Sequence, residues 1–472
     1  MLVSKNKKTE VVGLEKEQKM IKRTLKEIQE MVKGSGLNAA YEEIVVQGVT
    51  INSREVESGN LFIPIIGERV DGHIFAEVAV KQGAVATFWQ KDHDNVPTEI
   101  PVILVENTEK ALQQLATGYR NELNFKIVGI TGSNGKTSTK DILASILATT
   151  FNVHKTQGNF NSEFGMPLTI LQATEGTEVA VLEMGMRGIG QIALLSNIAR
   201  PDACIITNIG EAHIEELGSR ENISRAKMEI VAGLKDDGIF VYHGDEPLLM
   251  DKVAKLNASY RLETFGDHNT NDYYPTTMKI ADGGMVFTIP QVDFEFVLPV
   301  LGKHNVMNTL AAIGVAREFG VTYENIKKGL SSLEMTKMRM EIIKADNGFT
   351  MINDAYNSSP TSVRATLDLL TSLTGYEKKI VVLADMLELG NDKVAYHEEI
   401  GAYIDANEID YVFTYGPLAK HIALKAKVAN VQAFEDKEVL AEAIRNIATE
   451  QDIALIKGSR GMKLEEVIEM LK

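Results

Sequence analysis

The decapeptide GITGSNGKTS at residues 129–138 constrains this chain more than any other feature. It fits the pattern G-x-x-x-x-G-K-[ST], with a short apolar segment before it and an apolar-periodic, helix-like segment after it. Glycines let backbone N–H groups curl around a polyphosphate, and the N-terminus of the following helix adds favourable dipole charge. The decapeptide therefore predicts a strand, a phosphate-binding loop and a helix, and with them a nucleoside triphosphate site.

Two side chains of this loop carry the expected charge chemistry. Lys136 is expected to neutralise the β and γ phosphates, and the Thr137 hydroxyl is expected to bind Mg²⁺. The alternative is a glycine-rich turn with an exposed lysine, but a chance match in a chain of this length is expected on the order of once in a hundred sequences. The loop residues that we assign to the nucleotide are Gly132, Ser133, Asn134, Gly135, Lys136, Thr137 and Ser138.

Composition and charge exclude several classes of protein. With 44% hydrophobic and 24% charged residues among 472, the chain has the balance of a globular protein of about three domains. Its net charge of −16 argues against a general nucleic-acid binder, and no stretch approaches the ~18 apolar residues of a membrane helix. The single cysteine, Cys204, lies in an apolar run and is expected to be a buried thiol. We expect a cytoplasmic protein with no nucleic-acid or membrane partner.

The order of apolar segments predicts an α/β fold with three domains. Short strands and turns at 20–106 indicate a small N-terminal α/β domain. At 107–331, nearly continuous apolar strands between helices indicate a central parallel sheet covered on both faces, with an antiparallel addition at 258–300. Strand–helix alternation resumes at 332–472 and predicts a C-terminal Rossmann-like domain. Residues 1–19 are polar and lysine-rich and are expected to form a flexible extension.

Three polar residues beyond the loop are candidates for the same site. Glu183 ends an apolar strand, His213 follows another strand, and Lys227 lies 14 residues further on. Each has an ordinary explanation by itself: a solvated glutamate, a capping or surface histidine, and a solvated helical lysine. Because ligands bind at the carboxyl ends of the strands in such sheets, we expect all three to converge there with Thr137.

Longer strings in the sequence carry a resemblance to a known family. They are EMGMRGIGQI at 183–192, NIGEAHIEELGS at 208–219, LGKHNVMNTLAA at 301–312, MRMEII at 338–343, DAYNSSP at 354–360 and KGSRGMKLEEV at 457–467. With the phosphate loop, they make the chain similar from Met20 onward to the ATP-dependent Mur ligases of bacterial cell-wall synthesis. The resemblance implies three domains that close over the substrates: the first holds a UDP moiety, the second holds ATP, and the third completes the nucleotide and amine sites.

Two further strings narrow the resemblance within that family. TQGNFNSEFGMPLTIL at 156–171 and NSREVESGNLFIPIIGERVDGH at 52–73 resemble the members that join D-alanyl-D-alanine to a UDP-N-acetylmuramoyl tripeptide. The resemblance implies that the γ-phosphoryl group of ATP passes to the carboxylate of the tripeptide. The amine of D-alanyl-D-alanine then attacks the acyl phosphate, which forms an amide and releases phosphate. It implies ATP and Mg²⁺ as ligands, and we expect a monomer.

The resemblance also implies roles for single residues near the phosphates. Thr137 and Glu183 correspond to ligands of a first Mg²⁺, and His213 corresponds to the ligand of a second. Lys227 falls where several members carry a carbamylated lysine, which is a carboxylate-like metal ligand. Arg339 resembles an arginine that crosses from the third domain to the γ-phosphate. The expected catalytic residues are Lys136, His213, Lys227 and Arg339.

The remaining expected contacts concern the nucleoside and the muramoyl substrate. Asn305 and Asn308 fall where relatives contact adenine, although helix N-capping explains Asn308 equally well. Asp354 corresponds to the ribose-binding acid, with Tyr356 and Asn357 beside it, although an Asx-turn is an alternative. The resemblance places Ser53 and Arg54 at the uridine diphosphate end and Asn159 and Asn161 nearer the reacting carboxylate. Ser459 and Arg460 follow a strand end, where a β-to-α turn explains them equally well. The chain departs from the family pattern at Asn52, Ser162 and Ser358.

Two other functions stay open. A sister ligase would add a single amino acid to a muramoyl peptide, and the string GNFNSEFGMP argues against it. An ATPase that acts as a switch without ligation would leave Glu183, His213 and Arg339 without a shared purpose. The sequence does not decide between lysine and diaminopimelate as the third residue of the tripeptide.

Overall fold

The computed structural model describes all residues except 1–19 and 282. The predicted flexible extension therefore lies outside the described residues. The chain divides into two compact units, of which the first comprises 20–127, 152–182 and 197–200 and the second the other described residues. None of the helices within the described residues is both long and apolar enough to cross a membrane.

The N-terminal part of the first unit is a small α/β arrangement, as predicted. Its elements are β1 (Lys22–Thr24), α1 (Leu25–Met31), β2 (Val45–Gln47), β3 (Val49–Thr50), β4 (Leu61–Phe62), α2 (Ala76–Gln82), β5 (Ala86–Gln90), β6 (Val102–Val105) and α3 (Thr108–Leu123). The strands β3-β4-β5-β6 form a parallel sheet, and β1 pairs antiparallel with β2. Gly48 separates β2 from β3 and has φ of 85°. Few residues other than glycine adopt that conformation, which explains the glycine at this position.

A six-stranded sheet carries the phosphate loop. Its strands and the helices between them are β7 (Lys126–Thr131), α4 (Lys136–Leu147), β8 (Val153–Lys155), α5 (Gly165–Leu171), β9 (Val179–Glu183), α6 (Gln191–Ala199), β10 (Ala203–Ile206), α7 (Ile214–Leu217), α8 (Arg220–Met228), β11 (Ile239–His243), α9 (Pro247–Val253) and β12 (Arg261–Phe265). The strand order is β12-β11-β10-β7-β9-β8, and β10 runs parallel to both of its neighbours. Cys204 is buried in β10 as expected, and burial raises the pKa of its thiol.

The expected antiparallel addition at 258–300 is wrong for its first strand. The strands β13 (Thr277–Ala281), β14 (Gly284–Thr288) and β15 (Phe296–Leu298) do form an antiparallel sheet. In contrast, β12 pairs in parallel with β11 at the edge of the six-stranded sheet. Its first residues, Arg261 and Leu262, are exposed. The strand therefore lacks the continuous apolar run that identifies a parallel strand buried on both faces.

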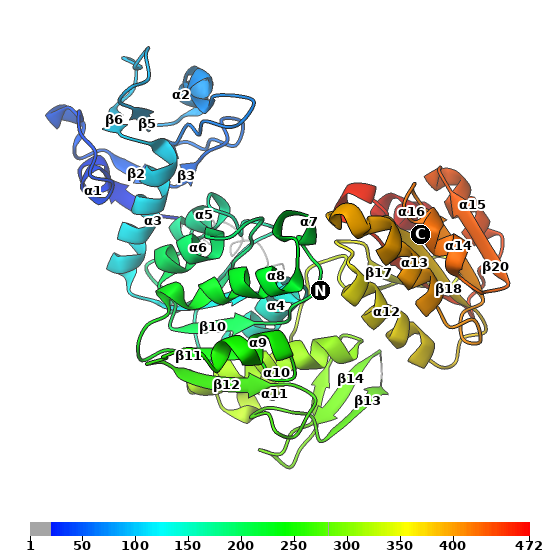
Figure 1. Cartoon of the computed structure of the whole chain (residues 1–472). Helices are drawn as coiled ribbons and strands as arrows, with labels where there is room; N and C mark the ends of the chain where they lie inside the picture. Colours follow the sequence, from blue (N-terminus) through cyan, green and yellow to red (C-terminus); the bar gives the residue numbers. More distant parts are fainter. Residues whose placement is uncertain (1–19, 282) are drawn as a thin grey trace, which may run out of the picture. The chain divides into compact units, whose positions relative to one another are not determined.

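The C-terminal third forms a second doubly wound sheet, which follows α10 (Lys303–Glu318) and α11 (Tyr323–Ser331). Its elements are β16 (Glu341–Lys344), β17 (Thr350–Asp354), α12 (Pro360–Ser372), β18 (Lys379–Ala384), α13 (Lys393–Tyr403), β19 (Tyr411–Tyr415), α14 (Lys420–Lys425), β20 (Asn430–Phe434), α15 (Lys437–Arg445), β21 (Ile453–Lys457) and α16 (Glu465–Leu471). The strand order is β16-β17-β21-β18-β19-β20, with β16 antiparallel and the rest parallel. Figure 1 shows this sheet among helices α12 to α16. The predicted α/β class is confirmed, whereas the domain limits at 106/107 and 331/332 stay predictions.

Candidate functional site

The phosphate loop joins β7 to α4, and its backbone needs glycine at two positions. Gly132 has φ of 150° and Gly135 has φ of 82°. A Cβ on Gly132 would lie 1.8 Å from Oγ1 of Thr207, and a Cβ on Gly135 would lie 2.6 Å from Oδ1 of Asn308. Any larger residue would therefore collide with the loop's neighbours, which explains the glycines of the sequence motif.

Lys136 lies inside this loop. Its ammonium donates hydrogen bonds to the carbonyl oxygens of Gly132 at 2.8 Å and Ser133 at 3.4 Å. Burial lowers the pKa of Lys136, and the carboxylate of Glu183 acts in the opposite direction. A partly buried cation surrounded by neutral carbonyl groups gains most from an anion, so the loop is built to receive phosphate oxygens.

Thr137, Glu183 and Arg339 meet at the start of α4. The Thr137 hydroxyl donates to Oε2 of Glu183 at 2.9 Å and accepts a hydrogen bond from Nη2 of Arg339 at 2.9 Å. Glu183 is 3% exposed, so the alternative of a solvated glutamate is wrong. The guanidinium of Arg339 lies 4.2 Å from the ring centre of Tyr356. The hydroxyl and carboxylate oxygens are donors that suit Mg²⁺, and the guanidinium suits a phosphate.

His213 and Lys227 are the other two expected metal ligands. Nδ1 of His213 lies 2.9 Å from Oε2 of Glu388, and this contact with His213 lowers the pKa of Glu388. Lys227 is 1% exposed, so the alternative of a solvated helical lysine is wrong. Burial lowers the pKa of Lys227 well below its ordinary value, and repulsion from Lys136 adds to this shift. The side chain therefore favours the neutral amine.

The phosphate loop is also held by hydrogen bonds from residues that were not predicted from the sequence. Asn208 accepts a hydrogen bond from the Asn134 N–H at 2.9 Å through Oδ1 and donates through Nδ2 to the Asn134 carbonyl at 3.2 Å. Ser359 donates its hydroxyl to Oδ1 of Asn134 at 3.1 Å, and Thr361 donates its hydroxyl to Oε2 of Glu211 at 2.7 Å. Asn208 could have been proposed from its position in the sequence, because it follows an apolar strand, as His213 does.

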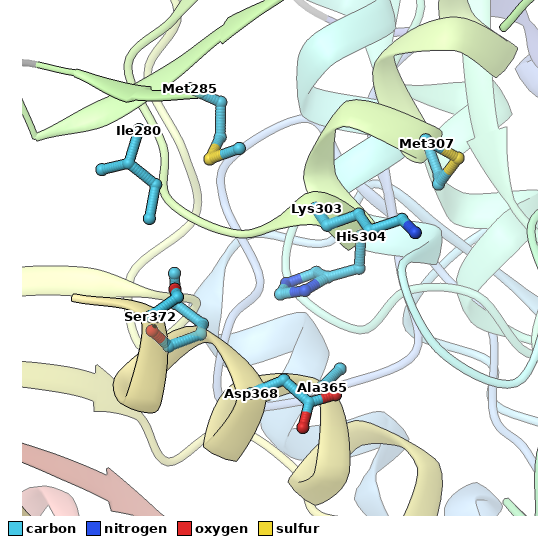
Figure 2. Close-up of a pocket in the computed structure, with 9 residues that line it drawn as sticks. Ile280, Met285, Lys303, His304, Met307, Ala365, Asp368 and Ser372 are labelled. Atoms are coloured by element: carbon cyan, nitrogen blue, oxygen red, sulfur yellow. Dashed lines mark hydrogen bonds between the residues drawn. The ribbon is translucent and has the colours of Figure 1, made fainter. Parts of the chain in front are cut away.

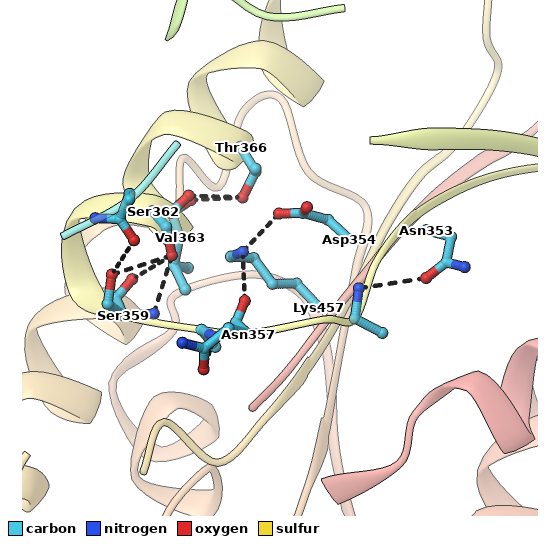
Figure 3. A network of polar contacts seen from close by, with 11 residues as sticks. Asn353, Asp354, Asn357, Ser359, Ser362, Val363, Thr366 and Lys457 are labelled. Atoms are coloured by element: carbon cyan, nitrogen blue, oxygen red, sulfur yellow. Dashed lines mark hydrogen bonds and ion pairs between the residues drawn. The ribbon is translucent and has the colours of Figure 1, made fainter. Parts of the chain in front are cut away.

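Asp354 has a partner that the sequence did not reveal. Figure 3 shows the ammonium of Lys457 between the Asp354 carboxylate and the Asn357 carbonyl, at 2.5 Å and 2.9 Å. Lys457 is 2% exposed. The Asx-type contact at this strand end belongs to Asn353, whose Oδ1 accepts the N–H of Ala355. The Asx-turn alternative for Asp354 is therefore wrong, and its expected contact with ribose stays a prediction.

The expected adenine contacts lie on the face of α10 that is turned towards the loop. Asn305 is buried and donates to the Leu301 carbonyl at 2.8 Å, and Asn308 donates to Oδ1 of Asn305 at 3.3 Å. The N-cap of this helix is Gly302, so Asn308 is not a capping residue.

A separate cavity of about 420 Å³ lies on another face of the same helix. Figure 2 shows the His304 ring directed into it from α10, with Ala365 and Asp368 of α12 opposite. Asn305 and Asn308 are not among the residues that line this cavity. Burial lowers the pKa of His304, and the charges of Asp354 and Lys457 also act on it.

Unpartnered polar atoms gather at the loop. Among the described residues, ten buried side-chain nitrogen or oxygen atoms have no hydrogen-bond partner. Four of them are Nδ2 of Asn134, Nε of Arg339, Oγ of Ser358 and Nδ1 of His213, the last of which lies 2.9 Å from the Glu388 carboxylate but outside hydrogen-bond geometry. Because buried polar groups are normally hydrogen-bonded, this concentration fits a site that binds a polar ligand. The donors suit a polyphosphate, and the residues present therefore fit ATP with Mg²⁺.

The residues expected to contact the muramoyl substrate belong to the first unit. Ser53 is buried, whereas Arg54 and Asn159 are exposed. The Arg54 N–H donates to Oδ1 of Asn52, and the Asn161 N–H donates to the carbonyl of Asn159. In the second unit, Ser459 accepts the N–H of Leu387, and Arg460 pairs with Glu465. These contacts favour a structural turn at Ser459 and Arg460.

A second polar cluster in the first unit consists of Asp71, His73 and His93, whose ligand atoms lie within 4.8 Å of one another. Nδ1 of His73 lies 2.7 Å from one Asp71 oxygen, and its Nε2 accepts the Gln90 N–H. Since Nδ1 then carries the proton, it is not available to a metal. Both nitrogens of His93 face acceptors, Asp71 and the Asp94 carbonyl, so only the imidazolium satisfies both. The cluster is therefore a hydrogen-bonded ion pair.

This cluster predicts a pH-dependent contribution of His93 to stability. The Asp94 carbonyl and Asp71 raise the pKa of His93, and hydrogen bonds lower the pKa of Asp71 to about 2 although burial opposes them. Because the pKa of His93 is raised in the folded state, its protonated form stabilises the fold fully below pH 6.5, the ordinary pKa of histidine. This contribution disappears as the pH rises through the pKa of the folded state. We expect H93N to cost up to about 1 kcal/mol at pH 5.5 and less at pH 8.5. Thermal melting of both proteins at the two pH values measures this, and an equal difference at both would contradict it.

Comparison with known proteins gives matches along nearly the whole chain. Residues 45–120 match the description "Mur ligase family, catalytic domain", residues 130–316 the Mur ligase middle domain, and residues 338–460 the Mur ligase glutamate ligase domain. The chain is 49% identical to a UDP-N-acetylmuramoyl-tripeptide–D-alanyl-D-alanine ligase of Bacillus subtilis, over 96% of this chain and 99% of that protein.

Solved structures agree with the sequence matches. The fold matches a crystal structure of MurF from Acinetobacter baumannii with a TM-score of 0.86 and 29% identity, over 96% of this chain and 99% of that one. A MurF ligase from Thermotoga maritima, solved in complex with ADP, matches with a TM-score of 0.81 and 32% identity, over 90% and 96%. With three matching domain descriptions and a closely similar full-length relative, the chain belongs to the Mur ligase family.

Proposed function

We propose that this chain is an ATP-dependent ligase that joins D-alanyl-D-alanine to UDP-N-acetylmuramoyl tripeptide. The product is the UDP-N-acetylmuramoyl pentapeptide used in peptidoglycan synthesis, with ADP and phosphate released. The observation that carries this proposal is the 49% identity, over almost the full length of both chains, to a ligase of that name. The meeting of Arg339, Thr137 and Glu183 at the phosphate loop supports the chemistry.

The chemistry explains why the site needs several cations. A carboxylate is a poor electrophile, so the γ-phosphoryl group first passes to the tripeptide carboxylate, and the acyl phosphate then has a leaving group. The amine nitrogen attacks the carbonyl carbon, the C–O bond to phosphate breaks, and the ammonium loses its proton. Two anions must approach in the first step, and Lys136 and Arg339 offset their repulsion. Closure of the site around the acyl phosphate would exclude water.

We propose Mg²⁺ sites on the same residues. Thr137 and Glu183 would hold a first ion, and His213 and carbamylated Lys227 a second. When bound, Mg²⁺ neutralises phosphate charge and orients the transferred group. Asn305 and Asn308 would contact adenine, Asp354 and Asn357 the ribose, and Gly132 to Ser138 the phosphates. In the first unit, Ser53, Arg54, Asn159 and Asn161 would bind the muramoyl substrate. We further propose the three domains 20–106, 107–331 and 332–472 in a cytoplasmic monomer.

Carbamylation of Lys227 gives a prediction of its own. The neutral amine nitrogen would attack CO₂ and lose one proton, which gives a carbamate anion in place of the buried amine. Because burial lowers the pKa of this amine, the reactive neutral form is available. We expect removal of CO₂ to lower kcat by about 10–100-fold, with recovery on adding bicarbonate. A carbamate signal in ¹³C NMR, present after ¹³CO₂ treatment and absent in K227M, measures the modification. Full activity without CO₂ and no such signal would contradict it.

Amine preference tests the proposed function against a sister ligase. The purified chain is supplied with ATP and Mg²⁺, with either UDP-N-acetylmuramoyl tripeptide or dipeptide, and with either D-alanyl-D-alanine or single amino acids. Mass spectrometry identifies the product. We expect the pentapeptide from tripeptide and D-alanyl-D-alanine. A tripeptide product formed from the dipeptide and a single amino acid would instead identify a sister enzyme.

A further inference from the structure

The contact between His213 and Glu388 joins segments far apart in the sequence. Glu388 lies in the loop that follows β18, and its Oε2 is 2.9 Å from Nδ1 of His213. The backbone reinforces this approach, because the N–H of Glu215 donates to the carbonyl of Glu388 at 3.3 Å. The N–H direction of His213 lies outside hydrogen-bond geometry, and a rotation of the ring would align it with the Glu388 carboxylate.

Both partners have an unusual backbone. His213 has φ of 65° and Glu388 has φ of 61°, in the left-handed region that non-glycine residues rarely adopt. Such conformations persist where the surrounding structure enforces them, and they gather at functional sites. Two left-handed residues that face each other therefore indicate that the position of their side chains matters more than local backbone preference.

The loop around Glu388 is firmly held. Oδ1 of Asp385 accepts the N–H of Leu418 at 3.0 Å and that of Ala419 at 2.7 Å. The Met386 N–H donates to Nε2 of the buried His397 at 2.9 Å, and the Leu387 N–H donates to Oγ of Ser459 at 2.9 Å. These four hydrogen bonds fix the loop on the C-terminal sheet, so that it presents Glu388 in one place.

We propose that Glu388 is a positioning residue for His213. A histidine that binds a metal through one nitrogen almost always donates its other N–H to a carboxylate or carbonyl, which fixes the ring orientation and the tautomer. With Nδ1 facing Glu388, Nε2 is the nitrogen left for a cation. The proposal rests on the proposed function, in which His213 holds the second Mg²⁺. If Glu388 positions His213, the part of the chain after residue 338 contributes two residues to the site. Arg339 lies at the phosphates, and Glu388 holds the metal ligand His213.

The test measures metal binding and stability together, on the full chain. Mn²⁺ replaces Mg²⁺, and electron paramagnetic resonance gives the affinity of each ion in the presence of a non-hydrolysable ATP analogue. E388G removes the carboxylate and relieves the left-handed backbone, so we expect an unchanged or higher melting temperature with the weaker Mn²⁺ affinity reduced about 10–100-fold. E388Q keeps an acceptor for Nδ1 and is expected to lose much less. E216Q, which removes an exposed carboxylate from α7, is the matched control and is expected to behave like the unmodified protein.

Each outcome decides the matter. If E388G binds both ions as tightly as the unmodified protein does, Glu388 does not position His213. If E388Q loses as much affinity as E388G, Glu388 is a direct ligand and the positioning proposal is wrong. If the unmodified protein binds only one Mn²⁺ with the analogue, the two-metal part of the proposed function fails, and this inference fails with it.

Discussion

R339M is expected to lower kcat about 10³-fold or more while leaving nucleotide affinity nearly unchanged. Arg339 donates to Thr137 Oγ1 at 2.9 Å, its Nε has no partner among the described residues, and its guanidinium packs on Tyr356. Its neighbours Met338 and Met340 have φ of 61° and 54°, so a strained backbone holds it in place. An arginine with an unused donor beside the phosphate loop is placed to stabilise charge on a transferred phosphoryl group.

Two measurements test the role of Arg339: kcat from steady-state kinetics, and the affinity for ADP from calorimetry. R339K is expected to recover little activity, because lysine lacks the planar pair of donors. R364M is the matched control, since Arg364 lies in the same C-terminal third and pairs with Glu399 at the surface. If R339M kept kcat within tenfold of the unmodified protein, the crossing arginine would have no part in phosphoryl transfer.

K136M is expected to lower kcat about 10²–10³-fold and to weaken ADP binding as well. The Lys136 ammonium is held within its own loop by two carbonyl groups, at 2.8 Å and 3.4 Å, where a phosphate chain would lie. Methionine has a similar length and no charge, so the loop keeps its packing and loses its cation. K255M, at an exposed lysine, is the control. Unchanged ADP affinity together with a near-normal rate would contradict the assignment of the loop to phosphate binding.

Local patterns were enough to predict the loop and most strands. The run KIVGI becomes β7, and the helix predicted from residue 107 begins at Thr108 because Asn107 caps it. Glu183 could be proposed because it ends an apolar strand, and parallel strands bring their carboxyl ends to one edge. Thr137 lies within the motif itself. These residues are predictable because neighbours in sequence determine their place.

Other site residues depend on contacts between distant segments. Asp354 and Lys457 are partners in the register of β17 and β21, although 103 residues separate them. Nothing near either residue indicates that these two strands are neighbours. Glu388 likewise reaches His213 only through the loop that the C-terminal sheet supports. The edge strand β12 was misassigned for a related reason, because its first two residues are exposed and its partner strand alone decides its direction.

Coupling of phosphate release to both substrates tests the central claim most directly. The chain is incubated with ATP and Mg²⁺, and UDP-N-acetylmuramoyl tripeptide and D-alanyl-D-alanine are added singly and together. Phosphate release that requires both, in step with pentapeptide formation, is the predicted result. Release at the same rate with neither substrate present would contradict the ligase account and leave an uncoupled ATPase.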